Sequence, residues 1–303
     1  MNKRNHFLCF GAVHSDYILR LKKEYLKNRT NPVSHHESIG GVAYNMAKIL
    51  IFVEQKTELI SIDTNLRIKK IIKKDGIIFR KLDNEINDRY YSSILNNNGK
   101  MIFGLANMDI YEKSLNLDKL KEQKNKKIIL DLNFSKKTIQ ILINKYYNNN
   151  YICVCGTSAH KVKKISSYLN KIDTLILNKQ ESLHLTGKLS IKEALKKLIE
   201  CNSKLNIIIT NGKNAVHGYE KKKIYICNPP KIIVNNENGA GDALSAYFNF
   251  FYCNSFKMKE SLTMSVAAGA LQASGYSNIR NKYLQKITNL SKGMKIKISN
   301  YNV

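Results

Sequence analysis

The chain lacks the features that would place it in a membrane or divide it into separate domains. It has three prolines and no tryptophan among 303 residues, and no stretch rich in Pro, Gly and Ser separates two halves. No apolar run reaches the ~18 residues that a membrane-spanning helix needs. The first apolar run, HFLCFGAV, is followed by His14 and Ser15, which is typical of a first strand and not of a signal peptide. We therefore expect a single domain over residues 1–303, without a membrane span.

The six cysteines form no C-x-x-C pair, the spacing that would indicate zinc binding or a redox motif. Cys153 and Cys155 alternate within CVC, as residues of a buried strand do. We interpret all six as reduced thiols of a protein core and expect a cytoplasmic protein. His35 and His36 lie next to no acidic or cysteine cluster in the sequence, so we expect a polar loop there rather than a metal site.

Acidic residues are too few to balance the basic ones, and the formal net charge is +27. An excess of this size is found in proteins that bind nucleic acid. Nearly all the basic residues are lysines in short scattered runs, however, and few arginines are available for bidentate contacts to phosphates or bases. Because 43% hydrophobic residues support a packed core, we interpret the lysines as solvent-exposed side chains. A nucleic-acid surface stays the minor alternative.

Short apolar runs alternate with amphipathic segments along the chain. This order predicts an α/β fold with a mainly parallel sheet covered by helices on both faces. The expected strands are residues 6–13, 57–62, 127–132, 151–156, 174–178 and 205–210. The expected helices are residues 41–53, 135–147, 158–169, 190–202, 241–253 and about 258–274.

Two regions interrupt this alternation. Residues 14–39 are polar and irregular, and residues 77–106 contain two strand-like runs joined by NNNG, which is typical of a hairpin turn. These segments predict a small β lid, which over an active site would exclude water. The tail, residues 280–303, is basic and weakly patterned.

The segment NNENGAGDALSAY, residues 235–247, contains two glycines between an apolar run and the helix that is expected to follow it. Where a strand leads through a loop into a helix, the backbone N–H groups at the helix N-terminus have no partner within the helix. The N–H groups of Gly239, Ala240 and Gly241 could therefore bind phosphate oxygens. Asp242 beside them could accept a proton from a hydroxyl that attacks the phosphate. The alternative is a tight turn in which Asp242 only starts the helix. No G-x-x-x-x-G-K-[ST] phosphate loop occurs.

A second glycine pair, Gly40 and Gly41 in SIGGVAYNMA, opens the helix expected near the N-terminus. Asn45 follows one turn later, and Asp16 follows the first strand. A carboxylate and an amide can each bind the hydroxyls of a polyol. The alternative is an ordinary loop-to-helix transition.

With GG-x-x-x-N early and N-G-A-G-D late, the chain resembles the ribokinase (PfkB) family of carbohydrate and nucleoside kinases over roughly residues 6–280. The resemblance implies a three-layer α/β sandwich with a small lid, and ATP-dependent phosphorylation of an alcohol with Mg²⁺. It assigns Asp242 as general base and Gly239, Ala240 and Gly241 as an anion hole. It assigns substrate binding to Asp16, Gly40, Gly41 and Asn45.

Two further segments fit this family. LNKQESLHLTG resembles its N-x-x-E segment, which places Asn178 near the nucleotide phosphates and Glu181 near Mg²⁺ through water. TNGKNAV resembles its nucleotide loop, which implies ATP binding by Thr210 and Gly212. The family's last glycine in that loop is Ala215 here. Asn236 and Glu237 replace an Asp-Thr whose Asp helps to bind a monovalent cation, so a cation site stays open.

Within the family, GGVAYNMAKIL and NNNGKMIFGLANMDIYEKSL most resemble pseudouridine kinases, although Asn107 stands where those tend to have Asp. This resemblance implies phosphorylation of the 5′-hydroxyl of pseudouridine. The alternatives are a related kinase for ribose, adenosine or a similar acceptor and, less favoured, a catalytically inactive protein that binds RNA. Some relatives form dimers through the lid edge, which makes a homodimer one option.

Overall fold

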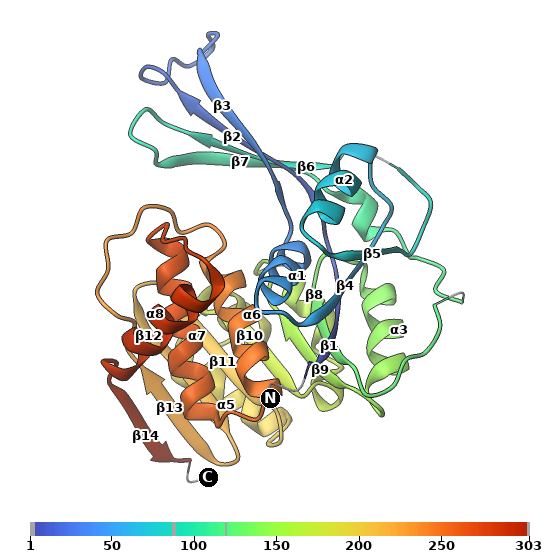
Figure 1. Cartoon of the computed structure of the whole chain (residues 1–303), viewed down its shortest axis with the longest axis vertical. Coiled ribbons are helices and arrows are strands. Elements are labelled where there is room, and N and C mark those ends of the chain that lie inside the picture. Colours follow the sequence, from blue (N-terminus) through green and yellow to red (C-terminus); the bar gives the residue numbers. More distant parts are fainter. Residues whose placement is uncertain (1–3, 87–88, 119, 302–303) are drawn as a thin grey trace.

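The computed structural model describes residues 4–86, 89–118 and 120–301, and its centre is a ten-stranded sheet (Figure 1). The strand order is β14-β13-β12-β11-β10-β9-β8-β1-β4-β5. The strands from β11 to β5 in this order pair in parallel, while β12, β13 and β14 extend the sheet antiparallel. Their bounds are β1 His6–Phe10, β4 Lys56–Ser61, β5 Ile78–Lys81, β8 Lys127–Asp131, β9 Tyr151–Cys155, β10 Thr174–Asn178, β11 Asn206–Asn211, β12 Asn214–Glu220, β13 Lys223–Cys227 and β14 Ile296–Asn300.

Helices cover both faces of this sheet. One face carries α1 Val42–Phe52, α2 Leu66–Lys74, α6 Ala240–Cys253, α7 Met258–Ala273 and α8 Arg280–Lys292. The other carries α3 Lys136–Tyr146, α4 Lys179–Thr186 and α5 Ile191–Cys201, with the short 3-10 turns η1 Asp109–Glu112, η2 Lys161–Ile165 and η3 Leu169–Lys171. Each face therefore has its own apolar core, and the predicted three-layer α/β sandwich with a mainly parallel sheet is confirmed.

The strands alternate between these two cores as their sequences require. Ile208 of β11 packs into the core under α6 and α7, whereas Ile207 and Ile209 face the opposite core. Successive side chains of a strand point to opposite faces, so a strand covered on both sides needs a continuous apolar run.

None of the described helices combines the length and the hydropathy that crossing a bilayer requires.

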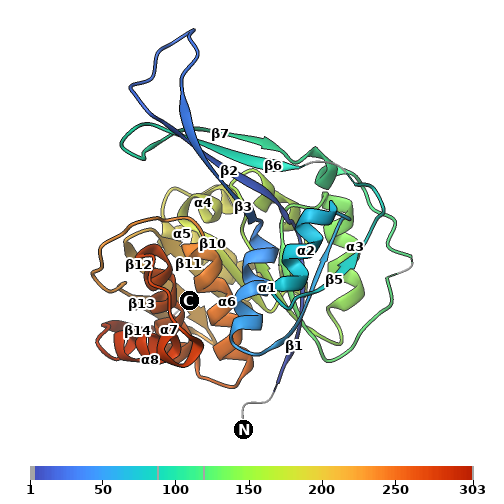
Figure 2. The ribbon, with the colours of Figure 1, turned by 45° about the horizontal axis from the view of Figure 1, so that its top comes forward.

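A second, four-stranded sheet rises from one end of the core and forms the lid (Figures 1 and 2). Its order is β3-β2-β6-β7, with β2 His14–Leu21, β3 Val33–Gly40, β6 Tyr90–Leu95 and β7 Met101–Asn107. The predicted Asn-Gly hairpin joins β6 to β7, and Gly99 takes the left-handed backbone (φ 81°) that this turn requires. β2 and β6 pair in parallel, and the other two pairs are antiparallel.

A buried arginine attaches the lid to the core. Arg89 immediately precedes β6 and donates hydrogen bonds to the carbonyls of Val13, Asp63 and Ile62, at 2.7, 2.7 and 2.9 Å. Its guanidinium also lies 5.0 Å from the ring centre of Tyr111. These contacts hold the start of β6 beside the start of β2, so the lid has a firm base above the core.

Several local features differ from the sequence predictions or were not predicted. Residues 158–169 contain the 3-10 turn η2 and the first residue of η3 rather than an α-helix, because apolar residues three apart, such as Val162 and Ile165, are buried equally well by a 3-10 turn. The weakly patterned tail folds into α8 and β14, and β14 pairs with β13 at the sheet edge. Residues 14–39 belong to the lid as predicted and contain β2 and β3, although no strands were predicted there, while β5, from the second predicted lid segment, joins the main sheet beside β4.

All six cysteines carry free thiols. Cys9, Cys153, Cys155 and Cys227 are buried, as expected for core residues, whereas Cys253 is half-buried and Cys201 is exposed. His35 and His36 lie in β3 rather than in a loop.

Candidate active site

The predicted site residues gather where the parallel strands end at their carboxyl termini, beneath the lid. β1 leads through Gly11, Ala12 and Val13 directly into β2 of the lid, and β3 returns at Gly40 to begin α1. α6 begins at the same end and packs along α1. Ligands of parallel α/β sheets bind at this carboxyl edge, because loops and helix N-termini converge there.

Asp131, at the end of β8, holds these segments together. It is fully buried, and its carboxylate accepts hydrogen bonds from the backbone N–H groups of Ala12 (2.8 Å), Ala43 (3.2 Å) and Asn133 (2.9 Å). A Cβ at Gly11 would lie 2.1 Å from this carboxylate, so only glycine fits there. The sequence reasoning missed Asp131, although an Asp that ends the buried run KIIL was the available signal.

Asp242 lies in the first turn of α6 and faces α1. Gly239 is the N-cap residue of α6, and its left-handed backbone (φ 75°, ψ −2°) suits glycine. The Asn45 amide donates a hydrogen bond of 2.7 Å to Oδ2 of Asp242. Within the described residues, no hydrogen bond joins the Asp242 side chain to the backbone of its own helix, which removes the support for a purely capping role.

The surroundings of Asp242 make it a stronger base than an ordinary Asp. Burial raises its pKa from 3.8 to about 6, and the negative charges of Asp131 and Asp16 add to this rise. The hydrogen bond from Asn45 and the nearby His14 oppose it. A carboxylate with this pKa is still largely ionised at neutral pH and accepts a proton more readily than an unperturbed one.

The early glycine pair makes room for Asp16. A Cβ at Gly40 would lie 2.1 Å from Oδ2 of Asp16, so any side chain there would displace the carboxylate. Gly41 has φ 117°, and a Cβ on it would lie 2.2 Å from the Ala12 carbonyl oxygen. The other carboxylate oxygen of Asp16 lies 2.9 Å from Nδ1 of His14. Asp16, both glycines, Asn45 and Asp242 therefore belong to one site.

The anion cradle at the start of α6 has fewer free amides than its three residues suggest. The N–H of Ala240 donates to the Glu237 carbonyl at 3.2 Å. Within the described residues, no hydrogen bond engages the N–H groups of Gly239 and Gly241. These two amides, together with the positive end of the helix dipole, are available to an anion.

Asn178 and Glu181 form a capping box at the start of α4. The N–H of Asn178 donates to Oε2 of Glu181 at 2.8 Å, and the N–H of Glu181 donates to Oδ1 of Asn178 at 2.9 Å. Burial raises the pKa of Glu181, the charge of Asp242 raises it further, and the N–H of Asn178 opposes the rise. Both residues thus have a structural role, and Glu181 lies within the electrostatic influence of the Asp242 site.

The predicted nucleotide residues lie at the adjoining strand ends. Thr210 of β11 pairs in register with Asn178 of β10. Gly212 has φ 56° in the hairpin between β11 and β12, with open space around it. Asn178 and Thr210 therefore lie on neighbouring strands, and Gly212 follows β11 at the same end of the sheet.

The donor set fits Mg²⁺ held mainly by water and phosphate. Glu181 offers carboxylate oxygens, which are hard ligands. Its Oε2 already accepts a hydrogen bond from the backbone N–H of Asn178. Within the described ranges, no group of three or more His, Cys, Asp or Glu side chains is arranged to hold a metal ion. Mg²⁺ usually keeps several waters and takes one or two protein carboxylates together with substrate phosphates, so such a group is not needed.

A family model and several solved structures match nearly the whole chain. A family described as pfkB family carbohydrate kinase matches residues 4–282. A carbohydrate kinase from Agrobacterium tumefaciens superposes with TM-score 0.79 at 20% identity, over 97% of this chain and 100% of that one. A nucleoside kinase from Methanocaldococcus jannaschii gives TM-score 0.76 at 17% identity, over 95% of this chain and 100% of that one.

A third solved structure contains a nucleotide. It is the ribokinase from Cryptococcus neoformans in complex with ADP, and it has TM-score 0.72 and 14% identity over 94% of this chain and 99% of that one. No curated protein sequence matches the chain. At these identities the solved structures establish the shared fold.

Proposed function

The chain belongs to the pfkB family of carbohydrate kinases, and we propose that it transfers the γ-phosphoryl group of ATP to the 5′-hydroxyl of pseudouridine. The kinase activity, with ATP as donor and an alcohol as acceptor, follows from the family. The observation that supports the proposed chemistry most directly is the Asp242 carboxylate, held by Asn45 beside two free amides at the start of α6.

In the proposed reaction Asp242 is the general base. The hydroxyl oxygen forms a bond to the γ-phosphorus, the bond from the γ-phosphorus to the β,γ-bridging oxygen breaks, and the hydroxyl proton moves to Asp242. ADP leaves with the bridging oxygen. A positioned base of this kind contributes on the order of 10²–10⁴ in rate.

The start of α6 supplies electrostatic stabilisation. The N–H groups of Gly239 and Gly241 are directed to the oxygens of the transferred group, where negative charge is spread in the transition state. They lie at the positive end of a helix of 14 residues, which favours bound phosphate. Two preorganised donors thus carry the role that three were predicted to share.

The acceptor is proposed to bind on the opposite side of Asp242. Asp16, Gly41 and Asn45 would hold the ribose hydroxyls, and the lid would cover them and exclude water. Support for pseudouridine, rather than another acceptor, comes from the sequences GGVAYNMAKIL and NNNGKMIFGLANM, which form the start of α1 and the lid hairpin.

The nucleotide is proposed to bind across the ends of β10 and β11. Thr210 and Gly212 would contact ATP, Asn178 would lie near its phosphates, and Glu181 would orient a water of hydrated Mg²⁺. The ion, when bound, neutralises phosphate charge. Because Asn236 and Glu237 replace the family's Asp-Thr, no monovalent cation is included in the proposal.

We also propose a homodimer formed through the lid. β7 is an edge strand, and all of its residues are exposed. Four of them are large and apolar: Met101, Ile102, Phe103 and Leu105. Monomeric proteins usually protect such an edge with charge or short length, so this strand is suited to pairing with a second copy.

We further propose a cytoplasmic location. The free thiols support it, because disulfides are rare in that compartment.

An acceptor panel with excess Mg·ATP tests the proposed substrate. Pseudouridine, uridine, adenosine and ribose are offered at equal concentration, and ADP release is measured for each. We expect the highest kcat/KM for pseudouridine. Faster phosphorylation of adenosine or ribose would reject pseudouridine and leave the kinase assignment intact, whereas no turnover with any alcohol, together with salt-dependent RNA binding, would support the inactive RNA-binding alternative.

A further inference from the structure

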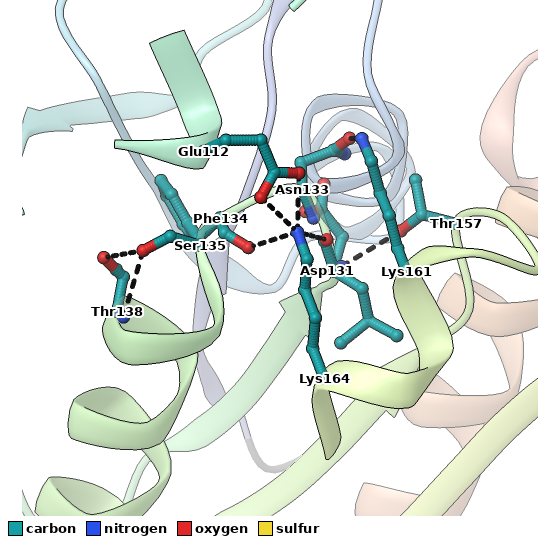
Figure 3. Close-up of polar contacts among 10 residues, drawn as sticks. Glu112, Asp131, Asn133, Phe134, Ser135, Thr138, Thr157, Lys161 and Lys164 are labelled. Carbon is teal, nitrogen blue, oxygen red and sulfur yellow. Dashed lines mark hydrogen bonds and ion pairs between the residues drawn. The ribbon is translucent and has the colours of Figure 1, made fainter. Parts of the chain in front are cut away.

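Two lysines of η2 point toward the loop after β8, and their surroundings differ (Figure 3). The Lys164 ammonium donates to both carboxylate oxygens of Glu112, at 2.7 and 2.9 Å. It also donates to the carbonyls of Phe134, at 2.8 Å, and Leu132, at 3.3 Å. Its hydrogen-bonding capacity is filled by the protein, so Lys164 is a structural residue.

Lys161 is half-buried but much less satisfied. Its ammonium donates to Oδ1 of Asn133 at 2.7 Å, and across the described ranges no carboxylate forms an ion pair with it. Burial lowers the pKa of Lys161, and the nearby charge of Lys164 acts in the same direction, while the charges of Asp131 and Glu112 oppose the fall. An ammonium has three N–H donors, and one contact to a neutral amide leaves two of them without a protein acceptor. A partly desolvated cation in this state is suited to a ligand that accepts hydrogen bonds.

Lys161 lies beside the proposed acceptor site. Its partner Asn133 is buried, and the N–H of Asn133 donates to the Asp131 carboxylate. The same carboxylate holds Ala12, at the base of the lid, and Ala43, at the start of α1. A chain of direct contacts therefore connects Lys161 to the segments that carry Asp16 and Asn45.

The pair presents donors only. Oδ1 of Asn133 is occupied by Lys161, and within the described residues its amide N–H groups make no hydrogen bond. The groups that the described residues leave without an acceptor are therefore N–H donors, two on the ammonium and the pair on the amide. Such a surface favours an oxygen acceptor that carries no proton, for example a ring carbonyl, and disfavours an amino group.

We propose that Lys161, aligned by Asn133, binds a carbonyl oxygen of the acceptor's base and so selects a pyrimidinedione over an aminopurine or a free sugar. This inference rests on the proposed function, because it assigns part of the same acceptor site. Lys161 is thus a specificity-determining residue at the end of the acceptor remote from the phosphorylated hydroxyl.

The test compares Lys161→Met with Lys163→Met. Lys163 is an exposed lysine of the same turn whose ammonium donates to the Leu185 carbonyl at 3.3 Å, so its replacement removes one lysine charge from η2 outside the proposed site. For Lys161→Met we expect the KM for pseudouridine to rise about 10- to 100-fold, the loss of one hydrogen bond to a charged group. The KM for ATP should stay unchanged, and Lys163→Met should match the wild type. Lys161→Gln, which keeps an N–H donor, should show a smaller rise.

Each outcome separates the two proposals. If the wild type phosphorylates pseudouridine and Lys161→Met has the KM of Lys163→Met, the role of Lys161 is refuted while the proposed function stands. If the wild type phosphorylates ribose or adenosine but not pseudouridine, both are refuted. If Lys161→Met and Lys161→Gln both fail to fold, as judged by melting and circular dichroism, Lys161 is structural and the inference is refuted.

Discussion

Replacing Asp242 by Asn should remove most of the turnover and leave the fold intact. An Asn side chain has nearly the same shape, and its oxygen can still accept the hydrogen bond that Asn45 donates. It cannot accept a proton from the acceptor hydroxyl. We therefore expect kcat to fall by about 10²–10⁴, the usual contribution of a general base. ATP should bind as before, because Asp242 belongs to the acceptor side of the site.

The same replacement should not lower stability. The pKa of Asp242 is raised from 3.8 to about 6, so between these values the folded protein binds more protons than the unfolded chain. The free energy of unfolding consequently decreases as the pH rises through this window, and the loss is complete above it. Asn does not ionise, so Asp242→Asn should have the same Tm as the wild type, or a higher one, at pH 8.

The raised pKa also predicts the pH dependence of the wild type. The base must be ionised to accept a proton, so kcat should rise as the pH passes through about 6 and then level off. The residual activity of Asp242→Asn should lack this rise.

The assay measures ADP release with saturating ATP and acceptor from pH 5 to pH 8, beside melting curves at both ends of that range. Asp173→Asn is a suitable control, because Asp173 lies at the amino-terminal end of β10, away from the site, and the one hydrogen bond that its carboxylate accepts among the described residues comes from the backbone N–H of Ile152. Turnover of Asp242→Asn within tenfold of this control would refute Asp242 as the base. A Tm well below the wild type at pH 8 would instead indicate a structural role.

Three further predictions concern the acceptor, the metal and the lid. Gly40→Ala places a Cβ in the space of the Asp16 carboxylate and should raise the acceptor KM at least ~10-fold, with the KM for ATP unchanged in the same steady-state assay. Glu181→Gln keeps a side-chain acceptor for the Asn178 amide but loses its charge, so a Mg²⁺ titration should show a higher half-maximal concentration at an unchanged Tm. Phe103→Lys puts a charge on the exposed edge of β7, and light scattering should find monomer where the wild type is a dimer; a monomeric wild type would refute the lid interface.

Much of the fold could be predicted because its signals are local. In α5 the buried residues Ile191, Ala194, Leu195, Leu198 and Ile199 follow the spacing of one helix face, so the sequence shows the element and its buried side. The lid strands β2 and β3 carry no such signal. Their sequences, HSDYILRL and VSHHESIG, mix polar and apolar residues without a regular alternation, so residues 14–39 were assigned to the lid but not to strands.

By itself, the sequence determined the alternation of strands and helices, the hairpin of the lid and the two glycine motifs, since each depends on neighbouring residues and on backbone angles that only glycine adopts easily. Only the tertiary structure decided how these pieces cooperate. Asn45 and Asp242 are 197 positions apart, and the amides gathered by Asp131 come from opposite sides of the lid in the chain. Whether a lysine is satisfied, as Lys164 is, or left for a ligand, as Lys161 is, depends on contacts that folding brings together from distant segments, and neighbouring residues carry no record of them.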